Sequence, residues 1–80
     1  MIVLNGARMD SRAALHAELK EKLSLPEYYG MNLDALNDCL SERTEPVHLW
    51  IASRGEGEVA RAVDIVCRVV GDNSGSVKEL

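Results

Sequence analysis

LPEYYGMNLDALNDCL, residues 25–40, decides the fold, because a proline, a glycine turn and an amphipathic segment follow one another within it. Pro26 ends the helix before it, since the residue preceding a proline avoids helical dihedral angles. Asn32 is a favourable N-cap residue, and the pattern after it predicts a helix from residue 33 to about residue 42. We therefore expect two helices separated by a loop that holds Tyr28 and Tyr29.

The predicted helix at residues 33–42 divides into an apolar and a polar half. At about 100° per residue, its apolar side chains fall on one side of the cylinder. The other side carries Asp34, Asn37, Asp38 and Ser41. Because Asp34 and Asp38 are four residues apart, their carboxylates are neighbours one turn apart. This face is either a solvated helix surface or a surface shaped for a partner.

The residues before this stretch predict a strand and a helix. Ile2-Val3-Leu4 is a short apolar run ended by Asn5-Gly6, which is typical of a buried strand followed by a turn. The next helix is expected to begin after Asp10 or Ser11 and to end before Pro26. Its buried side is predicted by a four-residue repeat of leucines, which consists of Leu15, Leu19 and Leu23.

The residues after it predict a strand, a third helix and a short last strand. Residues 47–52, VHLWIA, are apolar in five of six positions, which favours a strand buried on both faces. Gly71 is the expected C′ residue of the third helix, and the tail GSVKEL could form the last strand. The buried stripe of the third helix is predicted to be Val59, Ala62, Val63, Val66 and Val70.

The order of these elements, β-α-α-β-α-β, favours an α/β fold. Parallel neighbours need crossover connections, so we expect a small three-stranded parallel sheet covered by about three α-helices. Eighty residues suit a single domain, residues 1–80. With only three aromatic residues and no Phe, the core must be aliphatic.

The charge distribution points to a basic partner. The net charge is −4, which argues against nucleic acid, whose phosphates require a basic surface. Residues 27–45 hold five acidic residues and one basic residue, whereas the rest of the chain holds eight of each. Such a local field attracts a partner of opposite charge.

Other features indicate a cytoplasmic protein. Cys39 and Cys67 are too few to staple a secreted mini-protein, so we expect free thiols in a reducing compartment. The N-terminus lacks a signal-peptide pattern, and no apolar run approaches the 18 or so residues that a membrane span needs.

No pattern typical of an active site is present. Two carboxylates act as general acid and general base only in a cleft that shifts their pKa values apart. The solvent-exposed face of a short helix offers no such cleft. His16 and His48 lie outside the motif and are expected to be structural. The spacing of Cys and His matches no metal site, and no phosphate-binding loop is present, so we expect no cofactor, no metal and no enzymatic activity.

Binding fits the stretch better than catalysis. Carboxylates on a helix can enter a basic pocket and pair with Arg or Lys through charge-assisted hydrogen bonds. Where such a pocket normally holds phosphate, an aspartate can stand in for the phosphate. Tyrosine beside the carboxylates would add the buried area that interface centres use.

The stretch closely resembles the core motif of the barstar family, whose members are intracellular inhibitors of barnase-type secreted ribonucleases. The strand ending in Asn-Gly, the leucine-rich helix ending in LSLPEYYG, and NLDAL followed by DCL all look like that family. The strong match covers about residues 1–42. The resemblance implies a three-stranded parallel sheet covered by helices.

The resemblance also implies a function and its residues. Such a protein plugs the active site of a guanyl-preferring ribonuclease in a 1:1 complex, and is a monomer when free. Asp38 would occupy the substrate-phosphate site, and Asp34 would pair with a basic group at its rim. Tyr28 would stack near the catalytic histidine, and Tyr29 would support the loop. The predicted partner-binding residues are Tyr28, Tyr29, Gly30, Asn32, Leu33, Asp34, Asn37, Asp38, Ser41 and Arg43.

Several positions depart from the family pattern. Asn37 stands where barstars carry tryptophan, and Arg43 lies near another tryptophan position. One helix after Trp50 is expected to be missing, and acidic residues of the last helix are replaced near Val69 and Asn73, with Asp72 as a partial substitute. Two alternatives therefore stay open, an immunity protein against a different toxin domain and a regulatory interaction domain that has lost inhibition.

Overall fold

The structure is a computed structural model that describes residues 2–27 and 29–80, so the prediction for Tyr28 lies outside the described residues. The order of elements confirms the predicted alternation of strands and helices, with a 3-10 turn, η1, where the sequence predicts a simple turn. The elements are β1 (Ile2–Asn5), η1 (Gly6–Arg8), α1 (Arg12–Lys22), α2 (Leu33–Ser41), β2 (His48–Ser53), α3 (Gly57–Asp72) and β3 (Ser76–Glu79).

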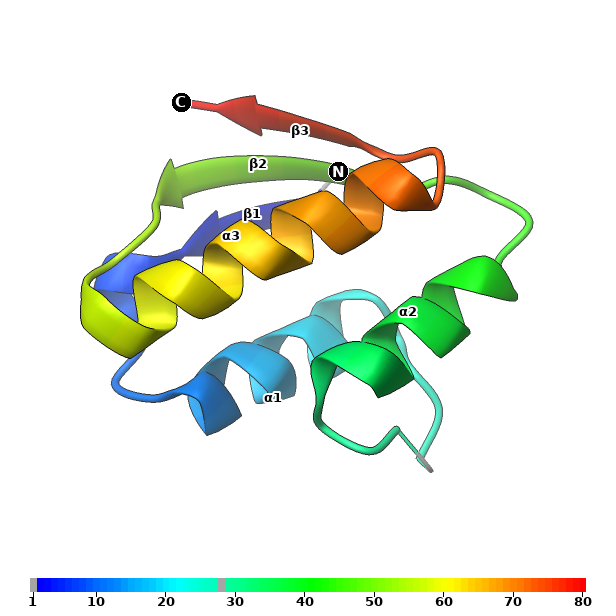
Figure 1. Ribbon diagram of the computed structural model, residues 1–80, viewed down its shortest axis with the longest axis horizontal. Helices are drawn as coiled ribbons and strands as arrows, with labels where there is room; N and C mark the ends of the chain where they lie inside the picture. The colour runs from blue at the N-terminus through cyan, green and yellow to red at the C-terminus, as the bar shows by residue number, and fades with distance from the viewer. Residues whose placement is uncertain (1, 28) are drawn as a thin grey trace.

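The three strands form one parallel sheet in the order β1-β2-β3. Both crossovers, through α1 and α2 and then through α3, step in the same direction across the sheet. Since such connections are right-handed, they place their helices on the same face. Figure 1 shows all three helices on one side of the strands, as this rule requires. The α/β architecture with a three-stranded parallel sheet is thus as predicted.

The opposite face of the sheet is open, so the prediction that residues 47–52 are buried on both faces is wrong. In β2, Leu49 and Ile51 are buried against the helices, whereas His48 and Ala52 point the other way and are exposed. The same alternation leaves Val3 of β1 40% exposed. Right-handed crossovers that step in opposite directions would be needed to cover both faces, and the two crossovers of this chain step in the same direction.

The core between sheet and helices is aliphatic, as predicted. It takes side chains from every helix and from β1 and β2, and Tyr29 is its one aromatic member among the described residues. The predicted stripes of α1 and α3 are all buried. The most deeply buried large side chains are Leu4, Leu15, Leu19, Leu36, Leu49, Val63, Val66 and Val70.

The end of α3 differs from the prediction. The helix continues through Gly71 to Asp72, with Asn73 as the C-cap residue and Ser74 in the left-handed region at φ 65°. Gly75 is the glycine that the geometry requires, because a Cβ there would overlap the carbonyl oxygen of Val47 and the side chain of Val70. A Cβ on Gly71 would have no neighbouring atom within 4 Å, so the prediction that Gly71 is the C′ residue that ends the helix is wrong.

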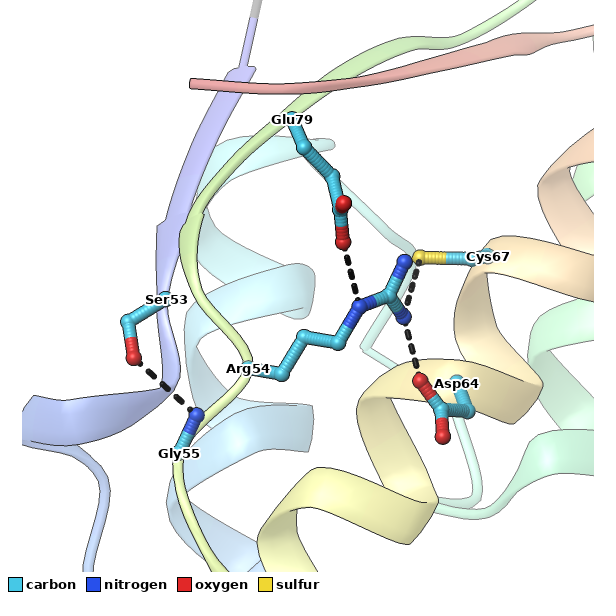
Figure 2. A network of polar contacts seen from close by, with 6 residues as sticks. All are labelled: Ser53, Arg54, Gly55, Asp64, Cys67 and Glu79. Atoms are coloured by element: carbon cyan, nitrogen blue, oxygen red, sulfur yellow. Dashed lines mark hydrogen bonds and ion pairs between the residues drawn. The ribbon is translucent and has the colours of Figure 1, made fainter.

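Arg54, just after β2, fixes the last strand to α3 (Figure 2). Its guanidinium donates to the carboxylates of Glu79 on β3 and Asp64 on α3, and one of its nitrogens lies 3.8 Å from the sulfur of Cys67. Cys39 and Cys67 are both free thiols, as predicted, although Cys67 is only partly buried. The Arg54 cluster lies on α3 and the sheet and includes no residue of α2.

Candidate functional site

The helix α2 presents the predicted polar face. The side-chain oxygen of Asn32 accepts a hydrogen bond from the backbone N–H of Ala35 at 2.8 Å, which confirms Asn32 as the N-cap residue. Leu36, Cys39 and Leu40 are buried, and Leu33 packs partly against the core. The polar side chains are all exposed; they are Asp34, Asn37, Asp38 and Ser41.

The carboxylates of Asp34 and Asp38 are uncompensated. Neither side chain has an ion-pair or hydrogen-bond partner among residues 2–27 and 29–80, whereas Asp64 on α3 is paired with Arg54. Like charges one turn apart repel, so this arrangement weakens an isolated helix slightly. Asp34 is offset by the positive N-terminal end of the helix dipole, and Asp38 lies a turn further on. Among the described residues, this face therefore carries two carboxylates and no basic side chain paired with them.

Arg43, the single base of the acidic segment, points away from these aspartates. Its guanidinium donates to the carbonyl oxygen of Leu23 at 2.9 Å, at the end of α1. A cation at the C-terminus of a helix is favoured by the helix dipole. The contact joins the ends of α1 and α2. Arg43 is thereby placed as a support of the helix, and its predicted contact with a partner stays a prediction.

Tyr29 anchors the loop before α2 from inside. It is 5% exposed, and its hydroxyl lies 2.6 Å from Nδ1 of His16 on α1 and donates weakly to the carbonyl oxygen of Asn32 at 3.4 Å. Burial raises the pKa of Tyr29 to about 12, with a smaller contribution from Cys39. Burial also lowers the pKa of His16, as does the charge of Arg12. The geometry matches the supporting role expected for Tyr29 and the structural role expected for His16.

The turn into α2 is made differently from the prediction. Gly30 was expected to permit the tight turn, but the residue in the left-handed region is Met31, at φ 58°. A Cβ on Gly30 would lie 3.2 Å from Nδ2 of Asn32, so the glycine allows that side chain to approach and donate to the carbonyl oxygen of Gly30. Met31 is 40% exposed beside Asn32, and nothing in the local sequence pattern singles it out.

Asn37 is linked to the end of α3, a contact that the sequence does not reveal. The side-chain nitrogen of Asn73 donates to the side-chain oxygen of Asn37 at 2.9 Å, across 36 residues of chain. The structure thus brings together α2, the loop before it and the C-cap of α3. Within the described residues, the predicted site is one continuous surface along α2, with Tyr29 beneath it and Arg43 at its end.

This surface is open, and it offers no ligand set. A groove between α1 and the start of α2 is lined by residues of both helices and of the loop, which are Arg12, Ala13, His16, Met31, Asn32, Leu33 and Asp34. Among residues 2–27 and 29–80, no three His, Cys, Asp or Glu side chains are grouped so that they could hold a metal ion. In the same part of the chain, none of the helices is both long and apolar enough to cross a membrane. The arrangement is suited to docking against a surface of opposite charge.

Comparisons with known proteins identify the family of the chain. The chain matches a family model described as "Barstar (barnase inhibitor)" over residues 1–72. It is also 50% identical over 40 residues to a protein of Bacillus subtilis (strain 168) named "Putative ribonuclease inhibitor YrdF". That match covers 50% of this chain and 44% of the relative, so the chain spans less than half of the relative's length. Since the family model covers nearly the whole sequence, the chain belongs to the barstar family.

Proposed function

We propose that this protein inhibits a barnase-type, guanyl-preferring secreted ribonuclease by covering its active site with α2 and the loop before it. The observation that carries the proposal is the pair Asp34 and Asp38, one turn apart on an exposed helix face and without a partner among the described residues. The family membership and the name of the Bacillus subtilis relative support a ribonuclease as the target.

The mechanism is occupation of a phosphate site by a carboxylate. A ribonuclease cleft is basic because it binds the phosphates of RNA, so its Arg, Lys and His side chains can bind Asp38 in place of substrate. Charge-assisted hydrogen bonds of this kind are about twice as strong as neutral ones. Asp34 then pairs with a basic group at the rim of the cleft. Asp38 becomes a hot spot, whose truncation costs more than about 2 kcal/mol of binding free energy.

The supports of α2 make this surface rigid before binding. The N-cap at Asn32, the bond from Arg43 to Leu23 and the bond between Tyr29 and His16 hold both ends of the surface. A preorganised surface loses less conformational entropy when it binds, which raises affinity. The inhibitor therefore needs no chemistry of its own and acts in a 1:1 complex by excluding RNA. An inhibitor located in the cytoplasm would protect the producing cell against its own ribonuclease.

One alternative has a specific observation in its favour. Asn37, at the centre of the exposed face, is where the barstar family resemblance places tryptophan, and here it is bonded to Asn73. A changed residue at the centre of the surface favours a changed partner, such as a different toxin domain with a basic cleft. In that case the carboxylate pair would bind in the same manner, and the identity of the partner would differ.

Inhibition of RNA cleavage tests the proposal. The protein is titrated into a barnase-type ribonuclease near physiological salt, and cleavage of a fluorescent RNA is followed. We expect cleavage to fall to zero at one equivalent, and to persist at that ratio with Asp38→Ala. Glu56→Ala is the matched control, because it removes an equal charge at the far end of α3 and its side chain makes no capping hydrogen bond. Full cleavage at a large excess of the wild type would refute this choice of target.

A further inference from the structure

The amide of Asn73 is fixed by two oxygen atoms. Its Nδ2 donates to the backbone carbonyl of Val69 at 2.9 Å and to Oδ1 of Asn37 at 2.9 Å. The backbone around it is also held, since its own N–H donates to the carbonyl of Val69 at 3.1 Å and the N–H of Gly75 donates to that of Val70 at 2.8 Å. The side chain therefore extends from a well-defined helix end towards α2.

This geometry determines which way both amides point. A backbone carbonyl oxygen can only accept, so Asn73 must turn its nitrogen, and not its oxygen, towards Val69. That nitrogen then faces Asn37 as a donor, and Asn37 must present its oxygen to it. A flip of either amide would lose one or both hydrogen bonds. The orientation of Asn37 is thus imposed by a backbone group of α3.

The consequence is a fixed donor between two acceptors. With its oxygen engaged, Asn37 leaves its amino group free, and this group has no acceptor among the described residues. Asn37 is exposed and shares the polar face of α2 with Asp34 and Asp38, which can only accept when ionised. The surface consequently offers a partner the pattern acceptor, donor, acceptor along one side of the helix.

We infer that the amino group of Asn37 is a specificity-determining donor for the ribonuclease partner, and that Asn73 is the residue that positions it. The inference rests on the function proposed above. Its complement on the partner is a neutral carbonyl oxygen at the border of the basic cleft, because a carboxylate there would be repelled by Asp34 and Asp38. A partner with Arg or Lys opposite Asn37 is disfavoured, since two hydrogen-bond donors would then face each other in an interface from which water is excluded.

The substitution Asn37→Asp separates this inference from simple electrostatics. An aspartate at 37 still accepts from Asn73, so the contact between the helices is kept, but the outward donor is lost and a negative charge is gained. Charge steering alone predicts tighter binding to a basic cleft. Our inference predicts binding at least about tenfold weaker, because a carbonyl of the partner is buried without a donor.

The substitution Asn73→Asp tests the positioning role. Aspartate at 73 cannot donate to Asn37 or Val69. Because it can only accept, it favours a flipped amide of Asn37 whose nitrogen points towards residue 73. We expect a comparable loss of affinity although residue 73 is not the proposed contact, with partial recovery in Asn73→Gln, which keeps a donor. Urea unfolding of each variant checks that the fold persists, and an affinity for the ribonuclease that is unchanged in a folded Asn73→Asp would exclude the positioning role.

Calorimetric titration of these variants into the barnase-type ribonuclease, beside wild type and Asp38→Ala, distinguishes the two levels of the account. If Asp38→Ala abolishes binding but Asn37→Asp binds as tightly as wild type or tighter, the inference is wrong and the proposed function stands. If the wild type does not bind the ribonuclease, the inference and the proposed function are both wrong for this target. In spectra of the free protein labelled with ¹⁵N, we expect slow hydrogen exchange at the Asn73 amide and fast exchange at that of Asn37. The reverse order would overturn the assigned orientation without any partner.

Discussion

The hydroxyl of Tyr29 lies 2.6 Å from Nδ1 of His16, and this single contact joins the loop before α2 to the middle of α1. The two rings are tilted by 54°, with centroids 5.9 Å apart. Both side chains are buried, so the hydrogen bond is shielded from water. The surface that carries Asp34 and Asp38 is thus supported by a contact that lies in the interior of the protein.

Removing the hydroxyl should weaken the fold while leaving the ring in place. Tyr29→Phe leaves a polar atom of His16 buried without a partner, which costs about 1–3 kcal/mol of unfolding free energy. Urea denaturation followed by circular dichroism measures the change. Val3→Ala, at an exposed position on the open face of the sheet, is the control and should cost less. Equal stability of Tyr29→Phe and wild type would contradict the role assigned to this contact.

Stability should depend on pH through His16. Its pKa is lowered in the folded protein, first by burial and then by the charge of Arg12, from the ordinary value of 6.5. Below that value the unfolded chain binds a proton that the folded protein does not, so the unfolding free energy falls as pH falls and levels off above it. Urea midpoints between about pH 5 and pH 7.5 measure this slope. His16→Gln lacks the titrating group and should show a smaller slope; parallel curves for the two proteins would exclude His16 as the cause.

The two glycines at the end of α3 should respond in opposite directions. Gly75→Ala forces a Cβ against the carbonyl of Val47 and the side chain of Val70, and we expect a loss of about 1–3 kcal/mol. Gly71→Ala places a Cβ in open space within a helix, where alanine is favoured by about 0.5–1 kcal/mol. Thermal or urea unfolding measures both. A destabilised Gly71→Ala would indicate that the helix ends earlier than Asp72.

Association with the proposed ribonuclease partner should be steered by charge. The acidic segment at residues 27–45 attracts a basic cleft over a distance of about one Debye length, so the association rate should fall as salt rises. Stopped-flow measurements between roughly 0.05 and 0.5 M salt give this dependence. Asp34→Asn should lower the association rate and flatten its salt dependence, and Glu56→Gln should leave both nearly unchanged. A salt-independent rate would argue against a basic partner.

The sequence predicts local features well, because they depend on short-range periodicity and caps. The leucine repeat of α1, the N-cap Asn32 and the split between Leu36 and Asp38 on α2 all follow from 3.6 residues per turn. The parallel sheet is predicted because helices lie between successive strands and provide the crossovers that parallel neighbours need. The family resemblance points to the same fold.

Features that depend on how elements pack were not predictable. The open face beside Trp50 follows from two crossovers that step in the same direction across the sheet, and the strand pattern does not encode this direction. The bond between Asn73 and Asn37 depends on where the end of α3 meets α2. Gly71 and Gly75 look equivalent as helix-ending signals, and only the approach of Gly75 to Val47 separates them. The left-handed Met31 is a further case, since methionine has no local preference for that conformation.

The most direct test of the central claim is the dissociation constant of the complex with a barnase-type ribonuclease, for wild type and Asp38→Asn. The amide has nearly the shape of the carboxylate, so the substitution removes the phosphate-mimicking charge and turns one of the two acceptor oxygens into a donor without emptying the site. We predict tight 1:1 binding by wild type and at least about 30-fold weaker binding by Asp38→Asn, which corresponds to about 2 kcal/mol. Glu56→Gln should bind as wild type does. Equal dissociation constants for wild type and Asp38→Asn would contradict the claim that this carboxylate occupies the phosphate site.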